Sequence, residues 1–580
     1  MKWGIIATVL LGGLLAFSSA QAMYLDEDET LQITGKVFTQ GSWRMEDSDS
    51  GGRACLANLG ANCEGWTFPN TKRGQLIQHR NLLDIEMYHN VGRELGPDFT
   101  LLDQLGYRLR VKYFYDGVYD YGPLQYRTPR FYSTPAYLAT LGATDRQGVI
   151  DARHLDTQKD PLWNAYVDLA RGPVKLRIGR QDLSWGESDG FRLLDMIEPL
   201  DNRFGFPLVE DLDDRRIPLW MVRPTLSIGT LGPLRNLTID SYWVPGTIDN
   251  EVSPVTPSGN PFATGSPPGK SVIFRPSKNL GDSRGGGRLI GTLGDVTFSL
   301  GHYVTFNDIP SLRLRATSIN IIPVGAPDAL PDFLIYAPDA AFLVEFYQQQ
   351  ITGASATFAL PFDPYTIVRM EAAHFWDERV FIPEQSVNAA VARCAAQLPY
   401  GAGPCPSPGV GDLPTKNVMR WMIGLDRNVW IRWLNPENTF FLSGQYFHTN
   451  IFNYDKDIAN GLPSNTHSAA VANVPLDPVN LPGVTRPMIA TSYDFVPRKQ
   501  DEVTLTYLIN TLVYHGTIQP QVFGAYDIRG VHAVVPSLSY QYGSNLVFTV
   551  KYAIIMGTYA NLGFFRDRDQ LLFRVQYNLS

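Results

Sequence analysis

The segment Gly186-Glu187-Ser188-Asp189-Gly190 carries the formal G-x-S-x-G pattern of a serine nucleophile. Such a serine works on a sharp strand-to-helix turn of an α/β chain, with a histidine base within reach. The chain shows no alternation of strands and helices, and its nine histidines have no catalytic or metal-binding spacing. A hydrolase at Ser188 is the least supported function, and we predict no enzyme, no catalytic residue, no cofactor and no metal site.

Charged residues recur at every second position of several stretches. Between Tyr107 and Tyr115 the odd positions are apolar or aromatic, whereas the even positions include Arg108, Arg110 and Lys112. Because successive side chains of a strand point to opposite faces, this stretch has one oily face and one charged face. An Arg or Lys that faces lipid near mid-membrane costs about 2–4 kcal/mol, so the charged face must point to water.

This pattern predicts an all-β fold, a transmembrane antiparallel β-barrel of eighteen strands. The strands are expected at 31–44, 75–91, 105–119, 162–171, 174–182, 219–229, 234–245, 284–293, 295–306, 342–358, 362–376, 415–428, 438–450, 499–514, 517–528, 531–542, 545–557 and 568–579. Tight turns alternate with long loops, as in barrels with short periplasmic turns and long extracellular loops. Only Arg529-Gly530 is tight where a long loop is due.

The N-terminus reads as a secretory signal, because Lys2 precedes an apolar stretch that ends in Ala20-Gln21-Ala22. This predicts a signal peptide at 1–22, a barrel at 23–580 and a place in the outer membrane of a Gram-negative bacterium. The expected partners are outer-membrane lipid, the barrel-assembly machinery and a periplasmic protein. The formal net charge of −8 argues against nucleic acid, which requires a basic face.

The four cysteines form two local pairs, Cys55 with Cys63 and Cys394 with Cys405. An exported chain meets an oxidising compartment, so we expect two short-loop disulfides. Residues 384–398 read as a short Ala-rich helix that the second disulfide would hold.

The predicted lumen is rich in cations. The side chains expected to line the pore are Arg108, Arg110, Lys112, Lys175, Arg177, Arg369, Arg420 and Arg574. They can either brace the barrel through ion pairs or form a basic track that selects solutes by charge. The sequence leaves both alternatives open.

The connection at 183–218 combines many charges with apolar residues that a free surface loop would not need. We predict that it folds into the lumen and constricts the pore, with an external cap as the alternative. Its carboxylates should pair with the arginines of the wall. The constriction residues are predicted to be Trp185, Glu187, Asp189, Arg192, Asp195, Asp211, Asp214 and Arg216.

The segments "GRQ…WGESDG", "RLLDMIEPLDN" and "EDLDDRRIPLWMV" resemble the signature of a large family of Gram-negative outer-membrane proteins, catalogued as domain of unknown function 1302. The residues that carry the resemblance include Gly179, Arg180, Gln181, Trp185, Gly186, Glu187, Asp189, Gly190, Leu194, Asp195, Pro199, Asp211, Asp214, Arg216, Ile217, Pro218, Leu219 and Trp220. The resemblance implies a membrane barrel and traffic of hydrophobic or organic compounds. It supplies no catalytic residue.

Three functions remain after the hydrolase. The favoured one is transport of an organic solute, hydrophobic in the preferred case, across the outer membrane. The alternatives are an anion-selective porin that uses the basic track, and a closed structural or surface-interaction barrel. The apolar stretch 318–338 is predicted to pack on neighbouring loops, or to form an entrance for a hydrophobic ligand.

Overall fold

The structure is a computed structural model of the full chain. It describes residues 23–24, 26, 28–47, 72–96, 98–126, 157, 160–203, 205, 208–254, 261–262, 270–324, 332–336, 341–383, 385–386, 389–398, 403–477, 481–557, 563, 565–566 and 568–579. The predicted signal peptide and the pair Cys55 and Cys63 lie outside these residues.

Eighteen strands form one closed antiparallel ring, as the sequence predicted. In ring order they are β2 (Leu31–Arg44), β3 (Leu76–His89), β4 (Gln104–Asp116), β5 (Leu162–Arg171), β6 (Val174–Gln181), β7 (Leu219–Leu231), β8 (Leu234–Val244), β10 (Arg284–Leu293), β11 (Val296–Phe306), β15 (Gln348–Leu360), β16 (Asp363–Arg379), β18 (Thr415–Val429), β19 (Phe440–Ile451), β22 (Asp501–Asn510), β23 (Ile518–Asp527), β24 (Val531–Tyr542), β25 (Leu546–Met556) and β26 (Gln570–Leu579). The pairing of β2 with β26, from Gly35–Leu579 to Arg44–Gln570, closes the ring. The two-residue strand β1 (Met23–Tyr24) adds to β2.

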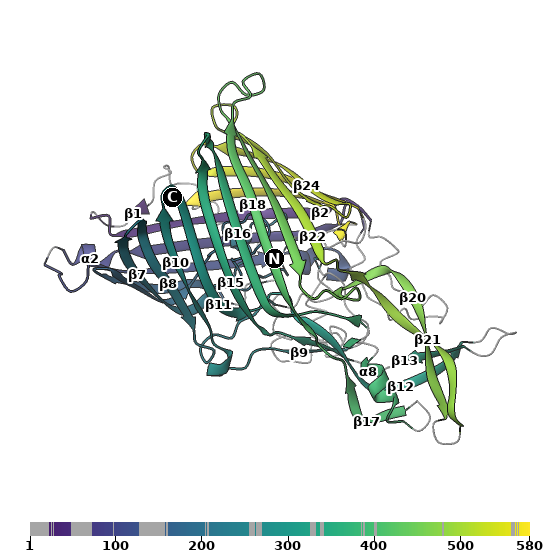
Figure 1. Cartoon of the computed structure of the whole chain (residues 1–580). Helices are drawn as coiled ribbons and strands as arrows, with labels where there is room; N and C mark the ends of the chain where they lie inside the picture. Colours follow the sequence, from purple (N-terminus) through teal and green to yellow (C-terminus); the bar gives the residue numbers. More distant parts are fainter. Residues whose placement is uncertain are drawn as a thin grey trace.

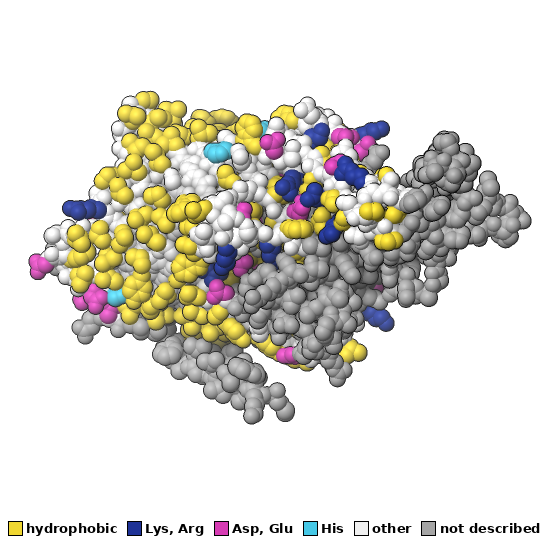
Figure 2. All heavy atoms as spheres, turned by 90° about the horizontal axis from the view of Figure 1, so that it is seen from below, with side chains coloured by type: hydrophobic (Ala, Val, Ile, Leu, Met, Phe, Trp, Pro, Cys, Tyr) yellow, Lys and Arg dark blue, Asp and Glu magenta, His cyan; other side chains and the backbone are white. Residues whose placement is uncertain are grey.

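The outer face of the ring is apolar. On β4 the exposed positions are Leu109, Val111 and Tyr113, as the period of two predicts. The same face continues around the ring through exposed aliphatic side chains such as Val167, Ile178, Leu300, Ile367, Ile423, Leu425, Leu505, Ile509 and Val550. Figure 2 shows hydrophobic side chains covering most of the visible barrel wall. This is the surface that a bilayer accepts.

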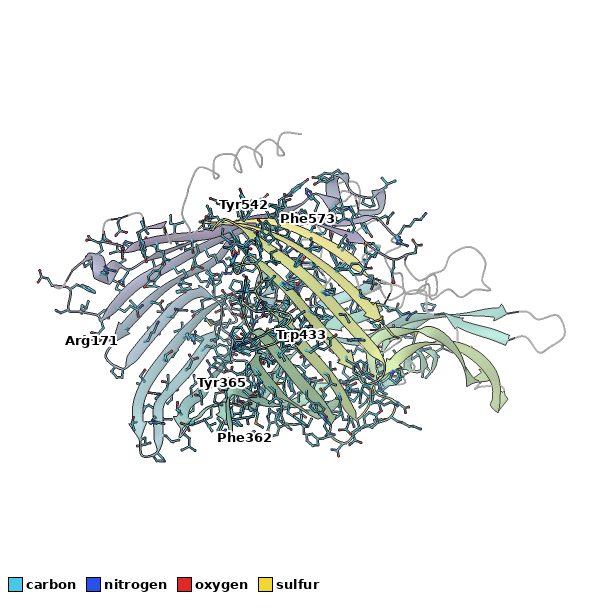
Figure 3. All side chains as sticks on the ribbon, turned by 90° about the horizontal axis from the view of Figure 1, so that it is seen from above. Arg171, Phe362, Tyr365, Trp433, Tyr542 and Phe573 are labelled. Carbon is cyan, nitrogen blue, oxygen red and sulfur yellow. A yellow bond between two sulfur atoms is a disulfide. The ribbon has the colours of Figure 1, made fainter. Side chains whose placement is uncertain are left out.

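Aromatic side chains border this apolar band at both ends. Near the short turns, Phe362, Tyr365, Trp433 and Tyr542 are exposed (Figure 3). Trp220, Trp243, Trp376 and Tyr526 are exposed near the opposite ends of the strands. Rings at both membrane–water boundaries are typical of transmembrane barrels, because an aromatic side chain has an apolar body and tolerates a wet edge.

The connections are short at one end of the barrel and mostly long at the other, where the predicted tight link around Arg529-Gly530, between β23 and β24, is the exception. β1, the helix α2 (Val91–Glu94) and the C-terminus lie at the short end (Figure 1). The other helices are also short: α3 (Val118–Tyr121), η2 (Leu124–Tyr126), α7 (Leu212–Arg215), η3 (Leu280–Asp282) and α8 (Ala389–Ala395). Among the described residues, no helix combines the length and the apolar character needed to cross a membrane.

A second sheet lies beyond the long-loop end and was not predicted. It contains β9 (Lys270–Phe274), β12 (Ser311–Val324), β13 (Asp332–Tyr336), β14 (Ala341–Glu345), β17 (Gly403–Val410), β20 (Ala459–Asp477) and β21 (Leu481–Pro497). Figure 1 shows the β20–β21 hairpin projecting away from the barrel.

Two predictions are corrected by this second sheet. The stretch 318–338, read as a loop, contributes to β12 and β13. The strand expected at 342–358 is two strands, because β14 pairs with β9 and β12 whereas β15 belongs to the ring. The side chains of 318–338 lie outside the described part of the chain, so the entrance for a hydrophobic ligand stays a prediction.

The apolar outer face gives a stability prediction. Leu300→Arg places a charge on the outer face of β11 and should lower the free energy of unfolding from vesicles by about 2–4 kcal/mol. Leu280→Arg, at a similarly exposed position in η3 outside the ring, is the control and should cost close to nothing. Denaturant titration of folding into phospholipid vesicles measures both. Equal losses for the two variants would contradict a lipid-facing wall at Leu300.

Candidate functional site

The connection between β6 and β7, residues 182–218, enters the lumen; we call it the inserted loop. We call the residues up to Asp201 its first limb and those from Glu210 onward its second limb. The two limbs pair with each other, because Asp201 N donates to Arg215 O at 2.7 Å and Ile217 N donates to Pro199 O at 2.9 Å. Arg216 holds the base together by donating to Asp195 and to Glu198 Oε2, the latter at 3.3 Å. The loop therefore has its own internal structure and does not depend only on the wall.

Trp185 anchors the first limb to the wall. Its Nε1 donates to Asp240 Oδ2 on β8 at 3.2 Å. Its ring packs edge-on against Tyr242 and Tyr303, with centroids 5.3 and 5.5 Å away. The guanidinium carbon of Arg288 lies 5.1 Å from the ring centroid. An indole with its N–H satisfied and its faces covered is well suited to fix a loop in a buried place.

The tip of the inserted loop, residues 187–194, reaches strands far from its origin. On β16, Glu371 accepts hydrogen bonds from the backbone N–H groups of Glu187 and Leu194. Arg369 pairs with Asp189 at 2.6 Å. A Cβ built on Gly190 would lie 3.0 Å from Phe523 of β23, on the side of the ring opposite β6 and β7. The loop thus crosses the lumen.

The acidic segment of the second limb, residues 210–214, is held by cations from the other half of the ring. Lys36 Nζ lies 3.0 Å and Lys112 Nζ 3.5 Å from Asp214 Oδ1. Burial alone would raise the pKa of Asp214, but these two lysines outweigh it and lower the pKa. The segment is therefore held to the wall in its ionised form.

Two further carboxylates extend this contact. Lys551 Nζ lies 3.3 Å from Asp211 Oδ1, and Arg574 NH2 lies 3.5 Å from Glu210 Oε2. Gln40 Nε2 also donates to Glu210 Oε1 at 2.7 Å. The contacts of residues 210–214 thus involve strands β2, β4, β25 and β26.

The side of the inserted loop nearest the long loops is covered by the connections after β8 and β11. Arg192 NH1 donates to Asp308 Oδ2 at 2.7 Å, and Ser253 Oγ donates to Asp308 Oδ1 at 3.0 Å. Burial raises the pKa of Asp308, and the nearby Arg192 opposes the rise. Ser253 Oγ also accepts from Leu200 N at 3.1 Å, so three connections meet at this point.

Every predicted pore-lining cation is within ion-pair distance of a carboxylate. The pairs are Arg108–Glu86 at 3.0 Å, Arg110–Asp84 at 2.6 Å, Lys112–Asp214 at 3.5 Å, Lys175–Asp168 at 3.9 Å, Arg177–Asp168 at 2.8 Å, Arg369–Asp426 at 2.6 Å, Arg420–Glu378 at 2.7 Å and Arg574–Glu210 at 3.5 Å. The cations that face inward are therefore compensated locally, which corresponds to the bracing alternative.

The predicted constriction residues all lie in the inserted loop, with different contacts. Five of them bond the wall or the covering loops through their side chains: Trp185, Asp189, Arg192, Asp211 and Asp214. Asp195 and Arg216 pair with each other, and Glu187 uses its backbone. Sequence reasoning missed two anchors on the strands, Glu371 and Gln445, of which Gln445 bonds Asp189. An acidic or amide side chain on a strand gives no sign of which loop it will meet.

Two other expectations concern chemistry. Ser188 Oγ lies 3.5 Å from Glu371 Oε2, so its partner is a carboxylate and not the imidazole that a serine nucleophile needs. Cys394 and Cys405 form the predicted disulfide, which joins α8 to β17. Within the described residues, no group of three or more His, Cys, Asp or Glu side chains could hold a metal ion.

Comparison with protein families decides the relationship. The model of the family described as protein of unknown function DUF1302 matches residues 3–579. The chain belongs to this family. The match covers the inserted loop and all eighteen strands of the ring, and it confirms the resemblance drawn from the motif around Gly179. A comparison of this DUF1302 chain with curated proteins gives no match.

Solved porins resemble the DUF1302 chain in outline. Pseudomonas aeruginosa OccK9 (OpdG) aligns with a TM-score of 0.40 and 8% identity, over 95% of this chain and 98% of that one. Salmonella typhi OmpF, solved in complex with daunomycin, gives 0.35 and 8%, over 96% and 100%. A mutant of the Rh. blastica porin gives 0.30 and 8%, over 95% and 100%. The barrel itself is established by the closed strand ladder and not by these likenesses.

The contacts of the acidic segment give a prediction about the inserted loop. Asp214 is 2% exposed and pairs with two lysines, whereas its neighbour Asp213 is 88% exposed. Breaking a buried pair by removing one partner costs about 3–5 kcal/mol, so Asp214→Asn should loosen the loop. Hydrogen exchange of the amides of 208–216 should become at least about tenfold faster, which corresponds to about 1.4 kcal/mol.

Asp213→Asn is the matched control and should leave the exchange of these amides unchanged. Equal exchange in Asp214→Asn and in the unmodified protein would show that the lysine pairs do not hold the loop.

Proposed function

We propose that the protein is an outer-membrane channel that carries an organic solute, hydrophobic in the preferred case, and that its inserted loop is the gate. One observation carries this proposal: a folded loop crosses the lumen of a closed membrane barrel and contacts strands on opposite sides. A barrel that served only as a surface scaffold would not require a polar lumen, nor a loop held across that lumen by ion pairs that can open to water. The gate is held by ion pairs and hydrogen bonds, which can be broken and remade without unfolding the ring, and by apolar packing of side chains such as Leu194, Ile197 and Val209 against the wall.

The lumen wall supports an organic solute over a small ion. The guanidinium of Arg177 lies 4.1 Å from the ring centroid of Tyr166, and Lys112 Nζ lies 4.5 Å from that of Trp163. Aromatic rings beside hydrogen-bonding groups suit a ligand that has both an apolar body and polar substituents. Trp163 and Tyr166 are both buried in this arrangement, so their rings can contact a solute only after neighbouring groups have moved.

The anion-selective alternative is supported less well. Selection by charge needs an excess of one sign along the path. Arg108, Arg110 and Arg177 instead pair with Glu86, Asp84 and Asp168 on the neighbouring strands. The field of each cation is cancelled close to its source, and a net basic track does not result.

Deletion of 186–214 tests the gate. The shortened connection between β6 and β7 should leave the ring closed and the lumen open, so single-channel conductance in planar bilayers should rise several-fold. Deletion of 464–492, the same number of residues from the β20–β21 hairpin, should leave the conductance unchanged because this hairpin projects away from the barrel (Figure 1). Heat-modifiable mobility on gels confirms that each variant has folded.

A channel for organic solutes should also allow uptake of such a solute into vesicles. Vesicles that contain the 186–214 deletion should take up a neutral aromatic solute such as benzyl alcohol glucoside faster than vesicles with the unmodified protein. An unchanged conductance in a folded 186–214 deletion would contradict the gate.

A further inference from the structure

The outer wall of the barrel carries an apolar depression of about 460 Å³ that lies over β4, β5, β6 and β7, which we call the wall crevice. Its sides are formed by Tyr107, Leu109, Val167, Ile178, Trp220 and Val222. Leu109, Val167, Ile178 and Trp220 are exposed on the lipid-facing side of the ring. Its volume falls within the roughly 300–1,000 Å³ range of small-molecule sites.

The crevice exists because one row of outward positions lacks lipid-facing side chains. The row runs Leu109, Ala165, Arg180 and Trp220 across the four strands. Ala165 is small. Arg180 is 6% exposed, and it donates to the carbonyls of Pro218 and Leu162 and to the carboxylate of Asp160 instead of facing lipid. At two adjacent positions of the row, Ala165 and Arg180, no large side chain therefore projects towards lipid. The resulting gap lies between Leu109 on one side and Trp220 on the other.

The backbone angle of Gly179 in β6 accounts for the direction of Arg180. Gly179 has φ +133°, and a Cβ there would lie 2.1 Å from the carbonyl oxygen of Ala165. Only glycine fits this position. Gln181 supports this backbone conformation, because its Nε2 donates to Gly179 O at 3.3 Å and to Met221 O at 3.2 Å. The sequence Gly179-Arg180-Gln181, which belongs to the family resemblance, therefore shapes the wall.

The crevice is closed towards the lumen. The ladder of β5 and β6 continues through Tyr166–Gly179, and that of β6 and β7 through Gly179–Met221. A solute in the lumen cannot reach the crevice through this part of the wall. The occupant must come from the bilayer itself.

We propose that the wall crevice binds the acyl chain of a membrane lipid. The lining is apolar apart from tyrosine hydroxyls, and the hydroxyl of Tyr107 lies 3.3 Å from Nδ1 of His89. A headgroup would find no charged partner among the residues that line it, whereas a hydrocarbon chain fits. Lipid offers no hydrophobic driving force within the bilayer, so the preference arises from the closer packing of a chain between Leu109 and Trp220.

Photolabelling tests this site. The full chain is reconstituted in phosphatidylethanolamine and phosphatidylglycerol vesicles with a trace of phosphatidylcholine that carries a diazirine in mid-chain. After irradiation, peptide mass spectrometry should find several-fold more adducts on 107–109, 165–167, 178–180 and 220–222 than on 298–302 and 352–356. Equal labelling of the two walls would overturn the proposal.

Two variants and one control make the test specific. Ala165→Phe fills the row and should reduce the crevice adducts several-fold. Ala354→Phe is the control: it lies in an outward row between Leu300 and Ala372, outside the crevice strands, and should not change them. If Ala165→Phe does not fold, Trp220→Ala removes one side of the crevice from an exposed position and should also reduce the adducts.

Crevice adducts that persist in the folded variants would overturn the proposal. A free fatty acid with the same diazirine distinguishes the source. If the free acid labels the crevice and the phospholipid does not, the occupant is a solute and the assignment to a membrane lipid is wrong. This result does not depend on the gate, because the conductance of the 186–214 deletion is a separate measurement.

Discussion

A bilayer provides no hydrogen-bond partner for an unpaired backbone group, and the rest of this structure depends on that constraint. The ring closes through the pairing of β2 with β26, so that no strand of the eighteen has a free edge within the wall. In a closed ring, the two-residue period of each strand sends aliphatic side chains to lipid and charged side chains to the lumen. The charges inside must then be compensated within a narrow space.

The lumen meets this second requirement partly with the inserted loop. Strand pairs such as Asp84 with Arg110 compensate each other across the wall. Lys36 and Lys112 instead depend on Asp214 of the loop, and Lys551 depends on Asp211. Part of the wall is therefore built to be completed by the loop. The same ion pairs that stabilise the closed arrangement are the ones that a gate would have to exchange with water.

The sequence predicted the ring because each strand pattern is local. Tyr107 to Tyr115 shows its two faces without knowledge of its neighbours, and Phe114 breaks the alternation only because it packs inward with Phe38 and Leu82. The second sheet was missed because several of its strands pair across long stretches of sequence, as β12 does with β17 and β14 does with β9. The position of the inserted loop was predicted from its mixture of apolar and charged residues, whereas Glu371 as its anchor follows only from the closed ring. The orientation of the Arg180 side chain could likewise not be predicted from the sequence, because it depends on the φ angle of Gly179.

The most direct measurement is zero-length carbodiimide crosslinking of the protein in membranes, followed by peptide mass spectrometry. Lys551 Nζ and the half-exposed carboxylate of Asp211 are 3.3 Å apart, although the two residues belong to distant parts of the chain. A crosslinked peptide that joins Lys551 to Asp211 is the predicted result. Its absence, with Asp211 modified by the reagent and Lys551 unlinked, would contradict a loop that crosses the lumen.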